Sequence, residues 1–251
     1  MELRGATILV TGAGRRLGRA IALSLAGGGA HLVLHVHSST AEDLVADIKK
    51  MGGRASVIKA DLAVPGEAAR LAQEVLRQVG AMDVLVNSAA VFFPAPVLTL
   101  GADEWRKVMR VNMTAPLILA MTLGREMKRR GKGKIIQLGD WGGQRPVRNY
   151  LPYCVAKGGL HVSTVALAKA LAPHVQVNEV VLGPVLPPSD YDAVALAALI
   201  GATPLARLGK SDDVLRAVRF LIEGGDFVTG ASYVVDGGWL AQAPGGRTTS
   251  L

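Results

Sequence analysis

The chain has 251 residues, half of them hydrophobic, a formal net charge of +8 and one cysteine, Cys154. A single cysteine excludes an internal disulfide and fits a reducing cytoplasm. The sequence has no uninterrupted apolar run of about eighteen residues, so no membrane-spanning helix is predicted. The positive charge suits an anionic ligand such as a phosphorylated cofactor, and it is also compatible with nucleic acid. The densest basic run, residues 124–134, is interpreted as a helix C-terminal cap, with a nucleic-acid patch as the alternative.

Apolar runs and helical patterns alternate along the chain. Strands are expected at 6–12, 31–36, 55–62, 82–90, 134–140, 175–183 and 231–238, and helices at 15–26, 41–51, 67–79, 103–127, 150–171 and 211–222. This alternation predicts one α/β domain over 1–251, with a doubly wound parallel sheet (a Rossmann fold) of about seven strands and helices on both faces. Residues 184–210, which begin with a proline- and alanine-rich segment, are expected to form a mobile substrate lid.

The turn after the first strand reads "VTGAGRRLGRA", with Gly12, Gly14 and Gly18 opening the first helix. Free backbone N–H groups and the helix dipole at such a turn can hold a pyrophosphate. Leu17 occupies the sixth place of the G-x-G-x-x-G pattern, so the match is one residue out of register. A plain tight turn is the alternative, and the βαβ context favours dinucleotide binding.

The end of the second strand distinguishes between cofactors. NAD enzymes place an acidic residue there to bind the ribose hydroxyls, and no Asp or Glu occurs between positions 18 and 41. The sequence offers His35, His37, Ser38 and Ser39 instead, with Arg15 nearby. Hydroxyls and cations suit a 2′-phosphate, so NADPH is predicted. The alternative is that the histidines merely finish the strand.

Tyr153 and Lys157 stand four residues apart on a predicted helix, and Asp140 precedes the tyrosine by thirteen residues. Residues four apart share a helix face, so the phenol and the ammonium can meet. The ammonium is expected to lower the pKa of the tyrosine and make it a proton donor near neutral pH. A surface pair without function is the alternative.

Several motifs together resemble the classical short-chain dehydrogenases/reductases over essentially the whole chain: "TGAGRRLG", "ADL" at 60–62, "NSAA" at 87–90, "VN" at 111–112, "YCVAK" and "DGG" at 236–238. The resemblance implies hydride transfer with a nicotinamide cofactor and a homotetramer. It implies Tyr153 as proton donor, Lys157 on the nicotinamide ribose, and Asn112 as a water-holding relay residue. Its cofactor contacts would be Gly12, Arg15, Arg16, Leu17, Gly18, His37, Ser38, Ser39, Asp61, Leu62, Asn87, Ala89, Tyr153, Lys157 and Pro184.

Two departures from the family pattern resemble its pteridine reductase branch. Arg16 stands where the family usually has glycine, and Asp140 stands where it usually has serine. Phe92, in "NSAAVFFPAP", matches the position that would stack on a pterin, with a core or lid aromatic as the alternative. Arg16 would contact both cofactor phosphates and substrate. Trp141 is a further candidate substrate contact, and filling the core is its alternative.

The chemistry of Asp140 gives an independent reason for a pterin-like substrate. Reducing a ketone builds negative charge on oxygen, which a carboxylate opposes, whereas reducing a C=N bond requires protonation of nitrogen, which a carboxylate favours. An Asp140 kept neutral by burial could instead donate as serine does.

The leading prediction is therefore an NADPH-dependent reductase of pterins or dihydrofolate. A 3-oxoacyl carrier-protein reductase is the alternative, and a non-catalytic dinucleotide sensor or nucleic-acid regulator is disfavoured by the intact Asn112, Tyr153 and Lys157. No metal site is expected.

Overall fold

A single parallel sheet organises the protein. The computed structural model describes residues 1–38, 40–187 and 191–242. Seven strands pair in the order β3-β2-β1-β4-β5-β6-β7, and every pairing is parallel. Their bounds are β1 Thr7–Val10, β2 His31–Val36, β3 Arg54–Lys59, β4 Val84–Asn87, β5 Gly133–Asp140, β6 Val175–Leu182 and β7 Ser232–Val235. This arrangement confirms the predicted Rossmann-type fold, and the strand order reverses between β1 and β4, where such folds bind ligands.

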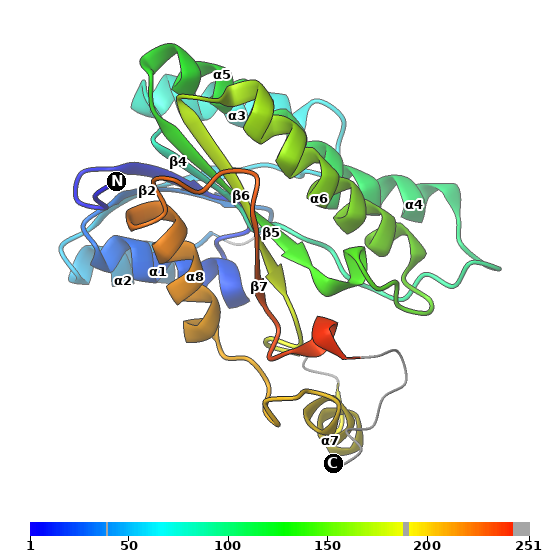
Figure 1. The fold of residues 1–251 in the computed structure, drawn as a ribbon. Coiled ribbons are helices and arrows are strands. Elements are labelled where there is room, and N and C mark those ends of the chain that lie inside the picture. The colour runs from blue at the N-terminus through cyan, green and yellow to red at the C-terminus, as the bar shows by residue number, and fades with distance from the viewer. Residues whose placement is uncertain (39, 188–190, 243–251) are drawn as a thin grey trace.

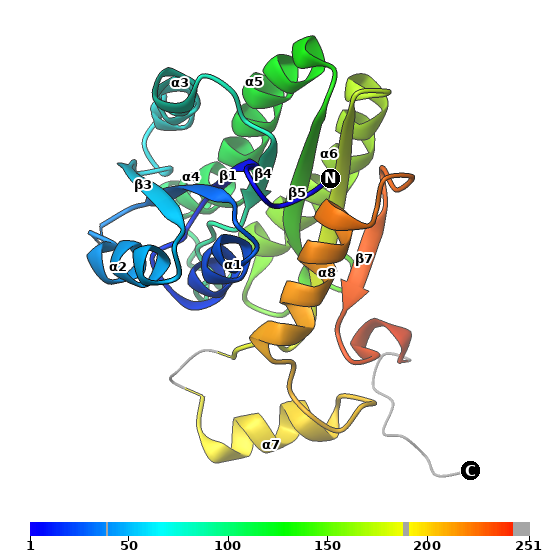
Figure 2. The same ribbon diagram turned by 90° about the vertical axis from the view of Figure 1, so that its left-hand side faces the viewer.

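Helices cover both faces of the sheet (Figures 1 and 2). On one face lie α1 Arg16–Gly27, α2 Glu42–Lys50 and α8 Ser211–Glu223. On the other lie α3 Glu67–Val79, α4 Ala102–Met109, α5 Ala115–Arg130 and α6 Leu151–Leu171. Among the described residues, no helix is both long and apolar enough to cross a membrane.

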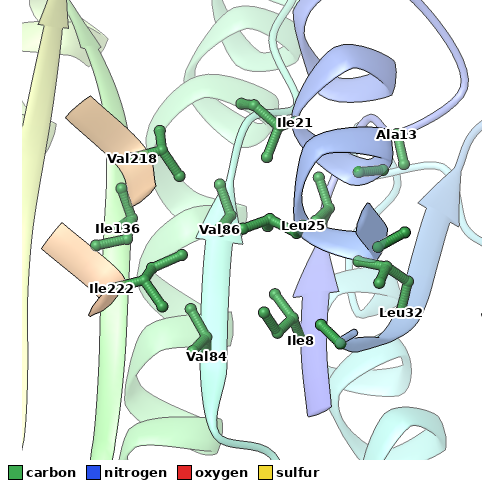
Figure 3. Close-up of a cluster of buried hydrophobic side chains, with 14 of the residues drawn as sticks. Ile8, Ala13, Ile21, Leu25, Leu32, Val84, Val86, Ile136, Val218 and Ile222 are labelled. Atoms are coloured by element: carbon green, nitrogen blue, oxygen red, sulfur yellow. The ribbon is translucent and has the colours of Figure 1, made fainter. Parts of the chain in front are cut away.

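The two faces of the sheet bury two separate cores. Along β1, Ile8 and Val10 belong to the core under α1 and α8, whereas Leu9 belongs to the core under α5. Successive side chains of a strand point to opposite faces, so a doubly covered strand must be apolar at every position. Figure 3 shows the first core, where α1 and α8 pack on β1, β2, β4 and β5 through Ile8, Ala13, Ile21, Leu25, Leu32, Val84, Val86, Ile136, Val218 and Ile222.

The helix predicted at 103–127 runs without interruption from Ala102 to Arg130, but a π-helical turn at Arg110–Thr114, which was not predicted, separates α4 from α5. Pro116 has no N–H to donate to the carbonyl of Asn112 four residues earlier, so the α-helical pattern breaks there. The Ala115 N–H instead bonds the carbonyl of Arg110, five residues back. Single π turns of this kind occur frequently at functional sites, and this one buries Asn112.

The proline- and alanine-rich segment contains a helix that the sequence analysis did not predict, α7 Ala193–Gly201. None of its residues is buried, and Figure 2 shows it beyond the carboxyl ends of the strands, away from the sheet. Asp192 accepts a hydrogen bond from the Ala195 N–H and caps the helix. The segment therefore has structure of its own, and its role as a lid stays a prediction.

The basic run at 124–134 ends α5, as predicted. Gly131 has φ of 81° and provides the left-handed C-terminal cap. Arg129 pairs with Glu126 one turn earlier, and Arg130 pairs with Asp83. These two arginines therefore form ion pairs within the end of α5 and with Asp83, the residue before β4.

Candidate active site

The glycine turn brings the N-terminus of α1 against the end of β4. Gly12 has φ of +67°, and a Cβ there would lie 2.8 Å from the Ala89 Cα. A Cβ at Gly18 would overlap the carbonyl of Gly12. Helix α1 begins at Arg16 with no acidic residue in its first turn and no side-chain cap, so no acidic side chain or cap in the described part of the chain satisfies its first N–H groups. This cradle fits a pyrophosphate.

Two buried polar side chains hold this turn: Thr11, which the sequence analysis did not select, and His35, which it placed at the 2′-phosphate. The Gly12 N–H donates to His35 Nδ1 (3.1 Å), so the ring proton is on Nε2, which donates to the Ala60 carbonyl (3.0 Å). Thr11 Oγ1 accepts from the Ser88 and Ala89 N–H groups, both at 3.0 Å. Burial lowers the pKa of His35 and keeps it neutral. The interpretation that His35 faces a 2′-phosphate is wrong, because the side chain points inward.

The remaining residues predicted for the phosphate end lie at the carboxyl edge beside β2. His37, Ser38 and Arg15 are exposed, and His37 Nε2 lies 3.5 Å from Asp61 Oδ2. Asp61 also accepts from the Ala63 N–H (2.9 Å). Ser39 lies outside the described residues. The structure thus brings the His37 imidazole next to Asp61, the residue expected near the adenine.

Other predicted cofactor contacts divide into packing and polar roles. Leu62 is buried in the core under α3 and α5, and Leu17 packs against the core under α1. Asn87 donates to the Gln137 Oε1 (2.9 Å) and the Pro116 carbonyl (3.2 Å), while its own Oδ1 is buried without a hydrogen-bond partner. An unpaired buried acceptor beside the glycine turn fits a ligand that carries a hydroxyl donor.

The structure brings Asp140, Tyr153 and Lys157 together at the carboxyl edge between β5 and α6. The Tyr153 hydroxyl lies beside the Asp140 carboxylate, close enough for each group to affect the pKa of the other, and the carboxylate accepts a hydrogen bond from the Gly142 N–H (2.8 Å). Lys157 Nζ donates to the carbonyl of Leu138 (2.6 Å) and lies 5.7 Å from the centre of the Tyr153 ring. The three side chains that the sequence spaced along β5 and α6 therefore form one polar cluster.

Desolvation dominates the acid–base properties of this cluster. Burial raises the pKa of Asp140, against the effect of the Gly142 N–H and Lys157. Burial and the neighbouring Asp140 raise the pKa of Tyr153 well above its ordinary value, so the expectation that Lys157 lowers it is wrong for the chain alone. Burial lowers the pKa of Lys157, and the charges of Asp140 and Glu179 oppose this. Tyr153 is therefore held protonated, and Asp140 is its nearest proton acceptor.

Asn112 is 1% exposed and its side chain fixes the segment after β4. Its Oδ1 accepts from the Val91 N–H (3.0 Å), and its Nδ2 donates to the Val91 carbonyl (2.9 Å). A Cβ at Gly159 of α6 would overlap the Met113 sulfur, so the π turn and α6 lie in close contact. Asn112 thus adjoins the helix of Tyr153 and Lys157, and its predicted relay role stays a prediction.

Aromatic rings form a wall beside Tyr153. Phe92 stacks on Tyr150 with ring centres 4.3 Å apart and meets the Tyr153 ring edge-on at 4.8 Å. Phe92 is 43% exposed, which excludes a core role. The Ala95 N–H donates to the Asn149 carbonyl (2.6 Å) and ties the two loops together. From the sequence, Tyr150 could either line the pocket or fill the core, and its stacking on Phe92 places it in the wall beside Tyr153.

Trp141, which directly follows Asp140 in the chain, forms a second pair of rings with Trp239, and their centres are 5.2 Å apart. Arg145 donates to the carbonyls of Trp239 (3.3 Å), Leu240 (3.0 Å) and Gln242 (2.6 Å), so the C-terminal segment is held against the turn that carries Asp140. This anchoring of Trp239 could not be predicted from either segment alone.

The loop after β6 connects the two ends of the site. The Pro184 carbonyl accepts from the Gly209 N–H (3.0 Å). Arg16 donates to the carbonyls of Leu186 and Pro187. Arg16, predicted to touch both phosphates and substrate, therefore reaches from the glycine turn to the predicted lid. Among the described residues, no group of three or more His, Cys, Asp or Glu side chains could hold a metal ion.

Comparison with known proteins agrees with this geometry. The family model described as "Enoyl-(Acyl carrier protein) reductase" matches residues 12–240. The chain is 32% identical to a 3-oxoacyl-[acyl-carrier-protein] reductase of Synechocystis (92% of this chain, 96% of that protein) and 33% identical to the L-xylulose reductase of Bos taurus (96% and 99%).

Solved structures give the same result. A structure titled as a putative NAD(P)-dependent gluconate 5-dehydrogenase of Beutenbergia cavernae, with bound NADP, superposes with a TM-score of 0.91 at 32% identity, covering 96% of this chain and 99% of the other. A metagenomic blue fluorescent protein in complex with NADPH gives a TM-score of 0.86 at 31% identity (95% and 99%). The chain belongs to the short-chain dehydrogenase/reductase family of oxidoreductases.

Proposed function

We propose that the protein is an NADPH-dependent reductase that acts on the ring C=N bond of a pterin or dihydrofolate. The observation that carries the proposal is the Asp140 carboxyl in contact with Tyr153, beside Lys157. A family member with a neutral hydroxyl at this position would favour a developing alkoxide, whereas a carboxyl favours a substrate that must gain a proton on nitrogen.

The choice of NADPH is supported by the residues at the end of β2 and by relatives. His37 and Ser38 are exposed there, Arg15 is exposed at the turn, and α1 offers its N-terminus to the pyrophosphate. Structures similar to this chain contain NADP or NADPH. When bound, NADPH would supply a hydride to the substrate.

The chain's own residues would manage position and protons. Lys157 would hold the nicotinamide ribose, and Tyr153 would donate its proton toward the substrate and recover one through Asp140. Phe92 exposes a ring beside Tyr153 on which a flat heterocycle could stack. Arg16 would bind phosphate and substrate, Trp141 would close the pocket, and residues 184–210 would cover it and exclude water.

The test is a comparison of substrates. Oxidation of NADPH would be followed with dihydrobiopterin, dihydromonapterin and dihydrofolate, and separately with a β-ketoacyl ester. Turnover of at least one pterin or folate in preference to the ester supports the proposal. Turnover of the ester alone would reject it.

A 3-oxoacyl-[acyl-carrier-protein] reductase is the second candidate. It is favoured by the 32% identity to the Synechocystis reductase and by a net charge of +8, which suits an acidic carrier protein. An Asp140 kept neutral by desolvation could donate a hydrogen bond to a ketone oxygen. The ester arm of the assay tests this candidate directly.

We further infer that the protein is a homotetramer. Val155, Val162 and Val165 of α6 are exposed, and so are Phe220 of α8 and Tyr233 of β7. Apolar surface of this extent is typical of subunit contacts, and two separate faces are what a tetramer of paired dimers requires. Light scattering would measure the mass, and a monomer would contradict the inference. A cytoplasmic location stays a prediction.

A further inference from the structure

A buried carboxylate, Glu179, lies behind the catalytic residues, and the proposed mechanism gives it no role. It stands on β6 opposite Gln137 of β5 and is 1% exposed. Ionisable side chains are almost never fully buried without partners, so its surroundings should explain it.

One oxygen of this carboxylate is held by α6 and β7. Glu179 Oε2 accepts from Ser232 Oγ and from His161 Nδ1, both at 2.8 Å. Ser232 Oγ also lies 3.1 Å from the same His161 nitrogen. A Ser–His–Glu hydrolytic triad needs two different ring nitrogens for its two hydrogen bonds, so this cluster is not one. Its geometry instead anchors the carboxylate between α6 and β7.

The other oxygen lies over Gly139 of β5. A Cβ at Gly139 would overlap Glu179 Oε1, so the glycine makes room for the carboxylate. Gly139 stands between Leu138, whose carbonyl accepts the Lys157 hydrogen bond, and Asp140. The charge of Glu179 acts on two nearby groups, Lys157 and Asp140. It raises the pKa of Lys157, which burial lowers, and it also raises the pKa of Asp140.

Two carboxylates therefore act on the Lys157 ammonium, Asp140 from the end of β5 and Glu179 from β6. The pKa of Tyr153, on the same helix as Lys157, is raised by burial first and then by Asp140 and the adjoining Cys154. The two carboxylates differ in one respect. Asp140 lies beside the phenol and, in the mechanism proposed above, would exchange a proton with it, whereas Glu179 bonds Ser232 and His161 among the described residues and would stand outside the path of the proton.

We propose that Glu179 is a positioning residue whose fixed charge keeps Lys157 protonated while Asp140 exchanges its proton during turnover. Each time Asp140 takes a proton, one of the two charges that hold the ammonium is lost. Glu179 is then the remaining counter-charge in a desolvated site, and His161 and Ser232 hold it there. The inference rests on the roles proposed above for Lys157 and Asp140, and it holds for any substrate that the enzyme reduces.

The experiment measures how Lys157 depends on pH with and without the charge at position 179. NADPH affinity, by fluorescence, and kcat would be followed from pH 6 to 10 in wild type, Glu179→Gln and Glu179→Asp. Loss of the charge should move the alkaline midpoint down by about 1 pH unit or more, and the aspartate variant should return it toward wild type. Glu74→Gln on α3, which makes the same charge change far from the site, should leave the midpoint unchanged.

A second variant covers the case in which Glu179→Gln does not fold. His161→Lys, at a side chain that is 39% exposed, would pair an ammonium with Glu179 and cancel its charge. Its midpoint should also fall, whereas Gln78→Lys on α3 should not change it. An alkaline midpoint unaltered by the folded variants, in both binding and kcat, would overturn the inference. The binding arm needs no substrate, so it stays informative even if no pterin is reduced.

Discussion

The two halves of the carboxyl edge are built in different ways. The cofactor half, around β1, α1 and β2, presents mainly backbone: a glycine turn, a free helix N-terminus, and a neutral His35 and Thr11 that hold them. The catalytic half, around β5, α6 and β6, presents ionisable side chains that burial has moved from their ordinary pKa values.

The two halves should therefore tolerate different substitutions. A backbone cradle depends on shape, so a single added methyl group damages it, while its affinity should vary little near neutral pH. A desolvated charge cluster depends on protonation, so an isosteric change that removes a charge should alter its pH profile more than its fold. The following predictions test this contrast.

The largest effect is expected at Tyr153. Tyr153→Phe removes the proton donor but keeps the ring that meets Phe92, so kcat should fall by about 10²–10⁴-fold. NADPH affinity should stay close to that of wild type. The check is steady-state kinetics beside fluorescence titration, and a variant that retains most of its kcat would remove Tyr153 from the chemistry.

Asp140→Asn should lower kcat for a pterin by about 10²-fold because it removes the proton relay. It should also raise thermal stability. Burial raises the pKa of Asp140, so the folded chain binds this proton more tightly than the unfolded chain does. The ionised carboxyl then destabilises the fold above the ordinary aspartate pKa of about 3.9, and not below it.

The gain in Tm of Asp140→Asn over wild type should therefore be absent near pH 3.5 and grow as the pH rises toward 8. Differential scanning calorimetry across this range measures it. A Tm difference that is independent of pH would show that the carboxyl is not desolvated as described.

Gly12→Ala tests the backbone half. An added Cβ would lie 2.8 Å from the Ala89 Cα, at a φ that L-residues rarely adopt. The displaced turn should weaken NADPH binding by roughly 10- to 100-fold, with kcat at saturating cofactor changed less. Gly52→Ala, another glycine at positive φ but in open space, is the matched control for backbone strain. Equal losses of affinity in both variants would reject the cradle.

The smallest effect is expected at His37. His37→Ala removes an exposed imidazole beside Asp61 that could bind the 2′-phosphate, and the ratio of kcat/KM for NADPH over NADH should fall by about 10-fold or less. Should the ratio stay constant, the discrimination of the 2′-phosphate must come from Arg15 or from another residue.

The sequence reveals the backbone half well and the charged half only in part. Alternating apolar runs predict the sheet because a doubly covered strand has to be apolar throughout, and glycine spacing predicts the turn because glycine has few other reasons to recur there. His35 was misplaced because a histidine at a strand end looks the same whether it points out or in. The break at Asn112 could be foreseen from Pro116, but α7 could not, because helix propensity competes there with flanking prolines.

In the catalytic half, spacing brings Tyr153, Lys157 and Asp140 together but does not give the sign of the pKa shifts. Sequence reasoning assumed that the ammonium lowers the pKa of the phenol, whereas burial and Asp140 raise it. The role of Glu179 could not be predicted from the sequence either, because its neighbours Gly139, His161 and Ser232 belong to three elements that meet only in the fold.

One measurement tests the role of Asp140 most directly: the ratio of kcat/KM for a dihydropterin to that for a β-ketoacyl ester, in wild type and in Asp140→Ser. If the Asp140 carboxyl assists the reduction of a C=N bond, wild type should prefer the pterin. In the serine variant this ratio should drop by about 10²-fold or more as carbonyl reduction rises. A wild type that reduces only the ester, or a serine variant with the same ratio as wild type, would contradict it.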